Sequence, residues 1–86
     1  MYVLINPKIS DLVKIGFTRR SPRKRAKELS GSWVPGEYKV AHKVEVGDPE
    51  KVERRVHTEL SNQRVRGGEF FEVEPERAVQ AIRKVM

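Results

Sequence analysis

The sequence predicts a single small α+β domain over residues 1–86. A three-stranded, largely antiparallel sheet is expected to be flanked by three helices in the order β-β-α-β-α-α. Three observations lead to this prediction. Two apolar runs at residues 2–5 and 12–17 are separated by turn residues, residues 37–46 alternate between apolar and polar, and a capping residue followed by proline precedes each of two helical patterns.

The first two strands are predicted to form a β-hairpin, because Asn-Pro and Ser-Asp pairs lie between them. A turn over residues 7–11 pairs Tyr2 with Gly16 and Leu4 with Lys14. Strand side chains alternate between faces, so the core face carries Val3, Ile5, Val13 and Ile15. Tyr2 and Lys14 then share the opposite face, beside a glycine that leaves room for a ligand. The plainer alternative is that Tyr2 packs and Lys14 is solvated.

The next two elements are a helix and a strand. Ser21 is a good N-cap and Pro22 suits the first helical position, which predicts a helix over residues 22–29 that is closed by Ser30-Gly31. After a loop at residues 32–36, the third strand has one apolar face, formed by Tyr38, Val40, His42, Val44 and Val46. A histidine on such a face is expected to be a core residue rather than a ligand.

Two more helices are predicted in the C-terminal half. Asp48-Pro49 begins the first by the same cap-then-proline pattern, and its apolar stripe consists of residues spaced four apart, Val52, Val56 and Leu60. Residues 69–71, Glu-Phe-Phe, follow a glycine pair, and the phenylalanines are expected in the core or in an edge strand. The last helix begins near Pro75 and is expected to bury Ala78, Val79, Ile82, Val85 and Met86.

The charge balance points to a polyanionic partner. Lys and Arg outnumber Asp and Glu by 18 to 12, which gives a net charge of +6. Such a field attracts nucleic acid, although an ordinary solvated basic surface is the alternative. The absence of cysteine excludes disulfides and thiolate zinc sites. Because no apolar run has membrane-spanning length and no signal-like segment appears, a soluble, cytoplasmic protein without a membrane partner is expected.

Positive charge is most concentrated in residues 19–27. Six of these nine residues are cations, namely Arg19, Arg20, Arg23, Lys24, Arg25 and Lys27. So many cations do not pack in a core, so the segment is either a solvated helix face or a surface that contacts phosphates. Phosphate contacts would make binding strongly salt-dependent.

Several of these segments carry a family resemblance. Residues 2–4 (Tyr-Val-Leu), residues 13–18 (Val-Lys-Ile-Gly-Phe-Thr) and Arg25 resemble the signature of GIY-YIG nucleases. They resemble in particular a phage and bacterial branch in which Val-Lys-Ile-Gly replaces the second tyrosine motif. Residues 53–57 and 64–71 are similar to later motifs of that branch. The motifs occur in the expected order over nearly the whole chain, which implies a GIY-YIG-like fold.

The resemblance implies roles for residues in the first half of the chain. Tyr2 would activate the nucleophile, directly or through water, and Lys14 would act electrostatically in the position of the family's second tyrosine. An arginine of the basic helix would contact the scissile phosphate. Arg25 fits this role best by spacing, and Arg23 is the rival. An arginine fork suits phosphate oxygens and stabilises charge that develops on them. Gly16 would support the site.

The second half contributes a carboxylate and a histidine four residues apart on one helix face, Glu53 and His57. By themselves they could be an ordinary surface pair. The resemblance implies that Glu53 is the single protein ligand of one divalent ion, Mg²⁺ or Mn²⁺, which fits the oxygen ligands of magnesium. His57 would assist proton transfer or bind a phosphate, and Glu69 would support the site.

The functional prediction is a metal-dependent endonuclease that hydrolyses DNA phosphodiester bonds with low intrinsic sequence specificity. By analogy with the family, the products would be a 5′-phosphate and a 3′-hydroxyl. The chain is too short to carry an attached specificity domain, so selectivity would have to come from a homodimer or a separate partner. The first alternative is a non-catalytic nucleic-acid-binding module that retains the fold and the basic surface. A weaker alternative is a protein-interaction domain.

Overall fold

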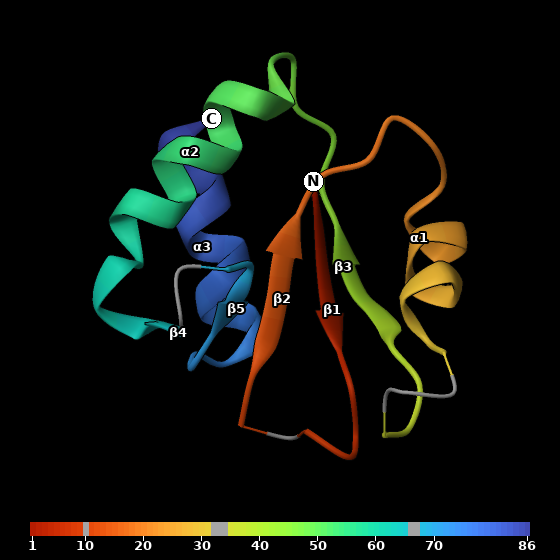
Figure 1. The fold of residues 1–86 in the computed structure, drawn as a ribbon. Coiled ribbons are helices and arrows are strands. Elements are labelled where there is room, and N and C mark those ends of the chain that lie inside the picture. The colour runs from red at the N-terminus through yellow and green to blue at the C-terminus, as the bar shows by residue number, and fades with distance from the viewer. Residues whose placement is uncertain (10, 32–34, 66–67) are drawn as a thin grey trace.

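The structure is a computed structural model that describes residues 1–9, 11–31, 35–65 and 68–86. Figure 1 shows the helices and strands. The six elements predicted from the sequence are present in the expected order β-β-α-β-α-α. In chain order the elements are β1 (Tyr2–Ile5), β2 (Val13–Gly16), α1 (Pro22–Leu29), β3 (Lys39–Lys43), α2 (Pro49–Glu59), a 3-10 turn (Ser61–Gln63), β4 (Arg64–Val65), β5 (Phe70–Phe71) and α3 (Pro75–Val85). Residue 10 of the predicted turn, residues 32–34 of the predicted loop and residues 66–67 lie outside the described residues.

The sheet is antiparallel throughout, with the strand order β3-β1-β2-β5-β4. The α+β class is confirmed, but the expected number of three strands is corrected to five among the described residues. The two added strands have only two residues each, and a segment that short shows no alternation in the sequence. The predicted hairpin register is confirmed, because Tyr2 pairs with Gly16 and Leu4 with Lys14.

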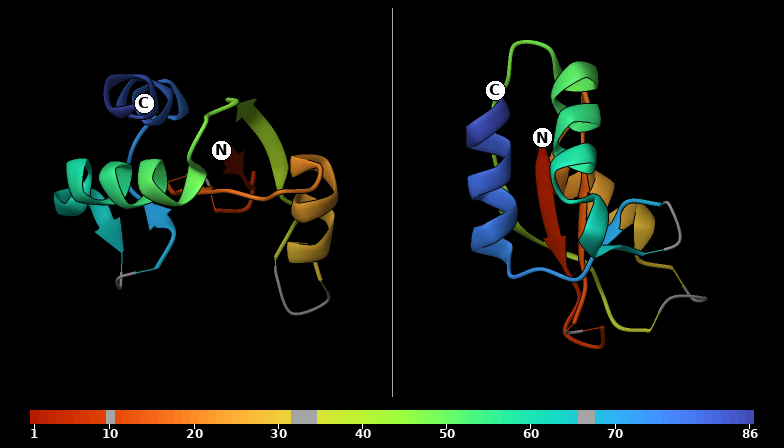
Figure 2. Two further views of the ribbon diagram at one scale, coloured as in Figure 1. Left: turned by 90° about the horizontal axis from the view of Figure 1, so that it is seen from above. Right: turned by 90° about the vertical axis from the view of Figure 1, so that its left-hand side faces the viewer.

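Helices cover both faces of the sheet. The turned views of Figure 2 show α1 on one side and α3 on the other. The core face of the hairpin packs on α2 and α3 through Val3, Val13 and Ile15, as expected. The opposite face is also covered, because Tyr2 and Leu4 pack on Ala26 of α1 and are buried. The plainer reading of Tyr2 as a packed side chain is therefore correct for its ring.

The third strand departs from the predicted pattern in its length and its faces. It pairs with β1, but the register shifts between Val3, which is opposite His42, and Leu4, which is opposite Val40. A bulge of this kind adds one residue and reverses the alternation of side chains. Val40 therefore packs on the α1 side, whereas Val44 packs on the other side. The expectation that His42 is a core residue is wrong, because its side chain is exposed.

The helices of the second half bury the stripes that their spacing predicts. Val52, Val56 and Leu60 of the α2 region are buried together with most of the predicted α3 residues. Fully burying a side chain of this size stabilises the fold by roughly 1.5–3 kcal/mol. Met86 is the exception, because it follows the last residue of α3 and remains 60% exposed. None of the helices in the described residues is long and apolar enough to cross a membrane.

Candidate active site

The paired strands β1 and β2 bring the first predicted site residues together. Tyr2 and Lys14 project from the α1 side of the hairpin, and Glu69 lies just before β5, where its backbone carbonyl accepts a hydrogen bond from the Ile15 amide at 2.9 Å. The Tyr2 hydroxyl donates to Glu69 Oε1 at 3.1 Å, and Lys14 Nζ lies 3.6 Å from the same oxygen. A phenol, a carboxylate and an ammonium group thus meet at one point.

Gly16 makes this close approach possible. A Cβ atom at this position would lie 2.6 Å from the Tyr2 hydroxyl oxygen and even closer to Glu69 Oε1. No side chain larger than hydrogen fits there unless the hydroxyl or the carboxylate moves. Glycine in strands is typical of such close approaches. The supporting role that the sequence predicted for Gly16 therefore has a geometric basis.

Burial and charge keep the Tyr2 hydroxyl protonated. The side chain is 1% exposed. Burial, followed by the negative charge of Glu69, raises the pKa of Tyr2 to about 12, while the Arg25 guanidinium acts in the opposite direction. At neutral pH the group is a phenol whose proton is directed at a carboxylate oxygen. It can take a proton from another group only as it passes its own proton to Glu69.

Helix α1 places one of its two rival arginines beside Tyr2. Arg25 lies on the half-buried side of the helix, and contact with the Tyr2 hydroxyl is the first cause of its raised pKa. Its guanidinium also lies 3.5 Å from Glu28. Arg23 is exposed and lines a different hollow with Val40 and Lys43. The structure therefore brings Arg25, and not Arg23, to the tyrosine.

Glu53 of α2 lies close enough to the site for the charge of Glu69 to act on it. Its half-buried carboxyl group has a raised pKa, because burial and the negative charge of Glu69 both disfavour the anion, whereas His57 and the Phe17 backbone act in the opposite direction. Two carboxylates that repel one another are the donors that a divalent cation would stabilise. Glu53 therefore fits the predicted ligand role.

A metal ion at this point would need few protein ligands. The described residues contain no cluster of three or more histidine or acidic side chains that could hold an ion. Mg²⁺ commonly keeps several waters and is bound through one or two carboxylates together with substrate phosphates. The half-buried carboxyl group of Glu53, together with substrate phosphate oxygens and waters, matches that mode of binding.

His57 lies deeper than the sequence suggested. It is 9% exposed, its ring packs on Phe71 at a centroid distance of 5.0 Å, and its Nε2 lies 3.1 Å from the Ile15 carbonyl oxygen. Because a carbonyl oxygen only accepts, Nε2 must carry the hydrogen in this contact. That nitrogen is not free to transfer a proton or to bind a phosphate. The geometry favours a positioning role, in which His57 ties α2 to β2.

We expect His57→Phe to lower the free energy of unfolding by about 1–3 kcal/mol, because a similar ring would leave the Ile15 carbonyl without its donor. Urea unfolding measures the change. The matched control is His42→Phe at an exposed position, where a change within about 0.5 kcal/mol is expected. Loss of activity in His57→Phe at unchanged stability would instead give His57 a direct chemical role.

The remaining cations of the basic segment form an exposed surface around α1. Arg19 pairs with Glu50 at 2.9 Å, and Arg20 pairs with Glu28 at 2.7 Å. The other three are exposed and have no ion pair within the part of the chain that the structure describes, namely Arg23, Lys24 and Lys27. These three charges are available to phosphates, whereas the first two are partly neutralised.

Two contacts of the site were not foreseen from the sequence. The Phe70 ring lies 4.7 Å from Lys14 Nζ, since the two residues are opposite one another on β5 and β2. A cation over an aromatic face is held electrostatically, so this ring helps to orient the ammonium group. Glu28 lies next to both Arg20 and Arg25. Its position three residues after Arg25 was the available signal for that pair.

A family model described as the T5orf172 domain matches residues 1–86. No curated protein and no solved structure matches the chain.

Proposed function

The chain belongs to the T5orf172 domain family, and from this premise we propose that it is a metal-dependent endonuclease of the GIY-YIG type that hydrolyses DNA phosphodiester bonds. The family suggests a nuclease-like or DNA-binding module of phage. The observation that carries the proposal is the contact of the Tyr2 hydroxyl with Glu69, beside Lys14 and Arg25 and within electrostatic range of Glu53.

The proposed first step is activation of a water molecule by Tyr2 and Glu69 together. As the phenol proton passes to Glu69 Oε1 along the 3.1 Å hydrogen bond, the phenol oxygen accepts a proton from the water. The water oxygen then attacks phosphorus. Lys14 offsets the negative charge that Glu69 carries before the transfer, and Phe70 orients the lysine. General acid–base transfer of this kind contributes roughly 10²–10⁴-fold to a rate.

The proposed second requirement is to stabilise charge on the phosphate. Arg25, beside Tyr2, offers a guanidinium fork to the non-bridging oxygens of the scissile phosphate. Glu53 would hold the divalent ion, and when bound that ion stabilises the charge that develops on the phosphate and on the leaving oxygen. The bond between phosphorus and the 3′ oxygen breaks and that oxygen takes a proton from solvent, which leaves a 5′-phosphate and a 3′-hydroxyl.

The exposed cations around α1 supply the proposed DNA contacts beyond the scissile phosphate. Arg23, Lys24 and Lys27 would bind flanking phosphates, which carry no sequence information. Cleavage by this domain alone is therefore expected to have low sequence specificity. We propose that selectivity comes from a homodimer or from a separate partner.

The test is nicking of supercoiled plasmid by the purified protein with Mg²⁺ or Mn²⁺, compared with EDTA. We expect nicking with either metal and none with EDTA. Glu53→Ala and Tyr2→Phe should both lose it, because one removes the proposed metal ligand and the other the hydroxyl. The matched controls are Glu76→Ala, an exposed acid of α3, and Tyr38→Phe, the chain's other tyrosine.

Two outcomes would contradict the proposal. Nicking that persists in EDTA would exclude the metal-dependent mechanism, and nicking that persists in Glu53→Ala would exclude Glu53 as the metal ligand. Salt-sensitive DNA binding without any nicking would favour a non-catalytic nucleic-acid-binding module, for which neither Tyr2 nor Glu53 is needed. Binding that is insensitive to salt would favour a protein partner, since phosphate contacts weaken steeply as salt rises.

A further inference from the structure

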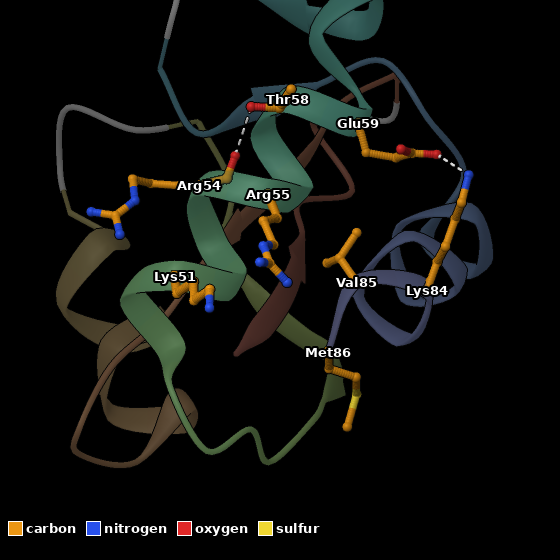
Figure 3. A pocket seen from close by; sticks show the side chains of 8 residues that line it. All are labelled: Lys51, Arg54, Arg55, Thr58, Glu59, Lys84, Val85 and Met86. Atoms are coloured by element: carbon orange, nitrogen blue, oxygen red, sulfur yellow. Dashed lines mark hydrogen bonds and ion pairs between the residues drawn. The ribbon is translucent and has the colours of Figure 1, made fainter.

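A second basic surface lies between α2 and α3. An open hollow of about 700 Å³ is lined by Lys51, Arg54, Arg55, Thr58, Glu59, Lys84, Val85 and Met86. In Figure 3 the side chains of Arg55 and Lys51 point from α2 toward the space beside the end of α3, and the Arg54 side chain points away from α3. Four of the eight lining residues are cations, and one is an acid.

The single acid of the hollow is already neutralised. Lys84 Nζ lies 2.7 Å from Glu59 Oε1, and this lysine lowers the pKa of Glu59. Lys51, Arg54 and Arg55 form no ion pair within the described residues. The three α2 cations are exposed, so they present uncompensated positive charge to solvent. Such a surface is complementary to a polyanion.

The spacing of these groups along the helix suits a nucleic-acid backbone. Lys51, Arg54, Arg55 and Thr58 occupy positions i, i+3, i+4 and i+7, so they follow one side of α2 over about 10 Å at 1.5 Å per residue. One strand of duplex DNA presents a phosphate about every 3.4 Å along its axis, which puts about three phosphates beside this row. Arginine forks pair with phosphate oxygens in a bidentate manner.

The hollow is separate from the candidate active site. Tyr2 lies on the sheet face that α1 covers, whereas the hollow borders α3, which covers the other face. A phosphate bound beside Tyr2 therefore does not occupy the hollow. We propose that the hollow between α2 and α3 binds the phosphate backbone of a second DNA segment, so that one molecule contacts two segments at once. This inference rests on the proposed action on DNA.

The test is capture of one duplex by another. A biotinylated 30-base-pair duplex is held on beads, protein is added in EDTA to prevent metal-dependent cleavage, and a fluorescent second duplex is scored for retention. We expect the wild type to retain it and Lys51→Gln/Arg55→Gln to reduce retention at least tenfold. The matched control is Lys8→Gln/Lys39→Gln, which removes two exposed charges that do not line the hollow. This control should behave as wild type.

Salt titration of duplex binding gives a second readout. Each lost phosphate contact makes the negative slope of log K against log salt less steep by about 0.9. The double variant of the hollow should therefore reduce the steepness by about two. Equal capture by the double variant and its control would overturn the proposal, as would a wild type that captures no second duplex. If Lys51→Gln/Arg55→Gln lost binding to polyglutamate but kept duplex capture, the hollow would be assigned to an acidic protein. That result would also overturn the proposal.

The capture test is independent of cleavage. If plasmid nicking fails while capture depends on Lys51 and Arg55, the proposed catalytic function is wrong and the second DNA surface stands. If nicking succeeds while capture is insensitive to these residues, the catalytic function stands and the second DNA surface is wrong. Nicking at saturating DNA should be unchanged in Lys51→Gln/Arg55→Gln, because neither residue lies at the candidate active site.

Discussion

A Gly16→Ala variant is expected to nick plasmid DNA at least a hundredfold more slowly than the wild type. The added methyl group would lie 2.6 Å from the Tyr2 hydroxyl oxygen and closer still to Glu69, so at least one of these groups must move. A displacement of about 1 Å at reacting groups can lower a rate about a hundredfold. Overpacking of this kind also lowers the free energy of unfolding by about 1–3 kcal/mol.

The matched control for this prediction is Gly47→Ala, because a Cβ atom at Gly47 meets no atom within 4 Å. Nicking rates and urea unfolding are compared for both variants. We expect Gly47→Ala to keep the wild-type rate. A wild-type rate in Gly16→Ala would mean that the contact between Tyr2 and Glu69 is not needed for the reaction.

Replacing Glu69 by glutamine is expected to lower the nicking rate about 10²–10⁴-fold, the usual range for a general acid–base group. Glutamine keeps the shape of the side chain and can still accept the hydrogen bond of the Tyr2 hydroxyl. It cannot take the proton at neutral pH, so the proposed transfer stops. The change also removes the negative charge that, after burial, is the second cause of the raised pKa of Tyr2.

Two measurements separate this proton-transfer role from a structural one. Phenolate absorbance, recorded in a Tyr38→Phe background so that Tyr2 is the only tyrosine, should show a lower pKa for Tyr2 in Glu69→Gln than in the parent. The nicking control is Glu72→Gln, an exposed acid just after β5 that should retain full activity. A nearly wild-type rate in Glu69→Gln would show that the Tyr2 proton goes elsewhere.

The hairpin and the helices could be predicted because their signals are local. Alternation on either side of a turn sets the pairing of Tyr2 with Gly16, and residues four apart mark the buried side of α2. The alternation of residues 37–46 is broken only at Ala41 and His42, and this single irregularity does not by itself predict the bulge opposite Val3 and Leu4. Strand β5 depends on pairing with β2 and strand β4 on pairing with β5, and neither has a period of its own.

The residues of the candidate site could be predicted from the family resemblance, but their arrangement in space could not. The residue types were identified through the family resemblance, but the contact between Tyr2 and Glu69 joins positions 67 residues apart. Nothing local in the sequence sets that distance. Spacing alone also left Arg23 and Arg25 as rivals, and only the packing of α1 on Tyr2 places Arg25 beside the hydroxyl. The burial of His57 likewise follows from how α2 docks on β2.

The short strand β5 makes the site vulnerable to local unfolding. Tyr2 and Lys14 lie on the central strands, whereas Glu69 is held by a two-residue strand and by the hydrogen bond from the Ile15 amide to its carbonyl. Segments with few backbone hydrogen bonds open at lower free energy than the core. Transient detachment of β5 would withdraw the carboxylate while the rest of the domain stays folded. The rate of hydrogen exchange at the Ile15 amide would then report how often β5 detaches and Glu69 leaves the site.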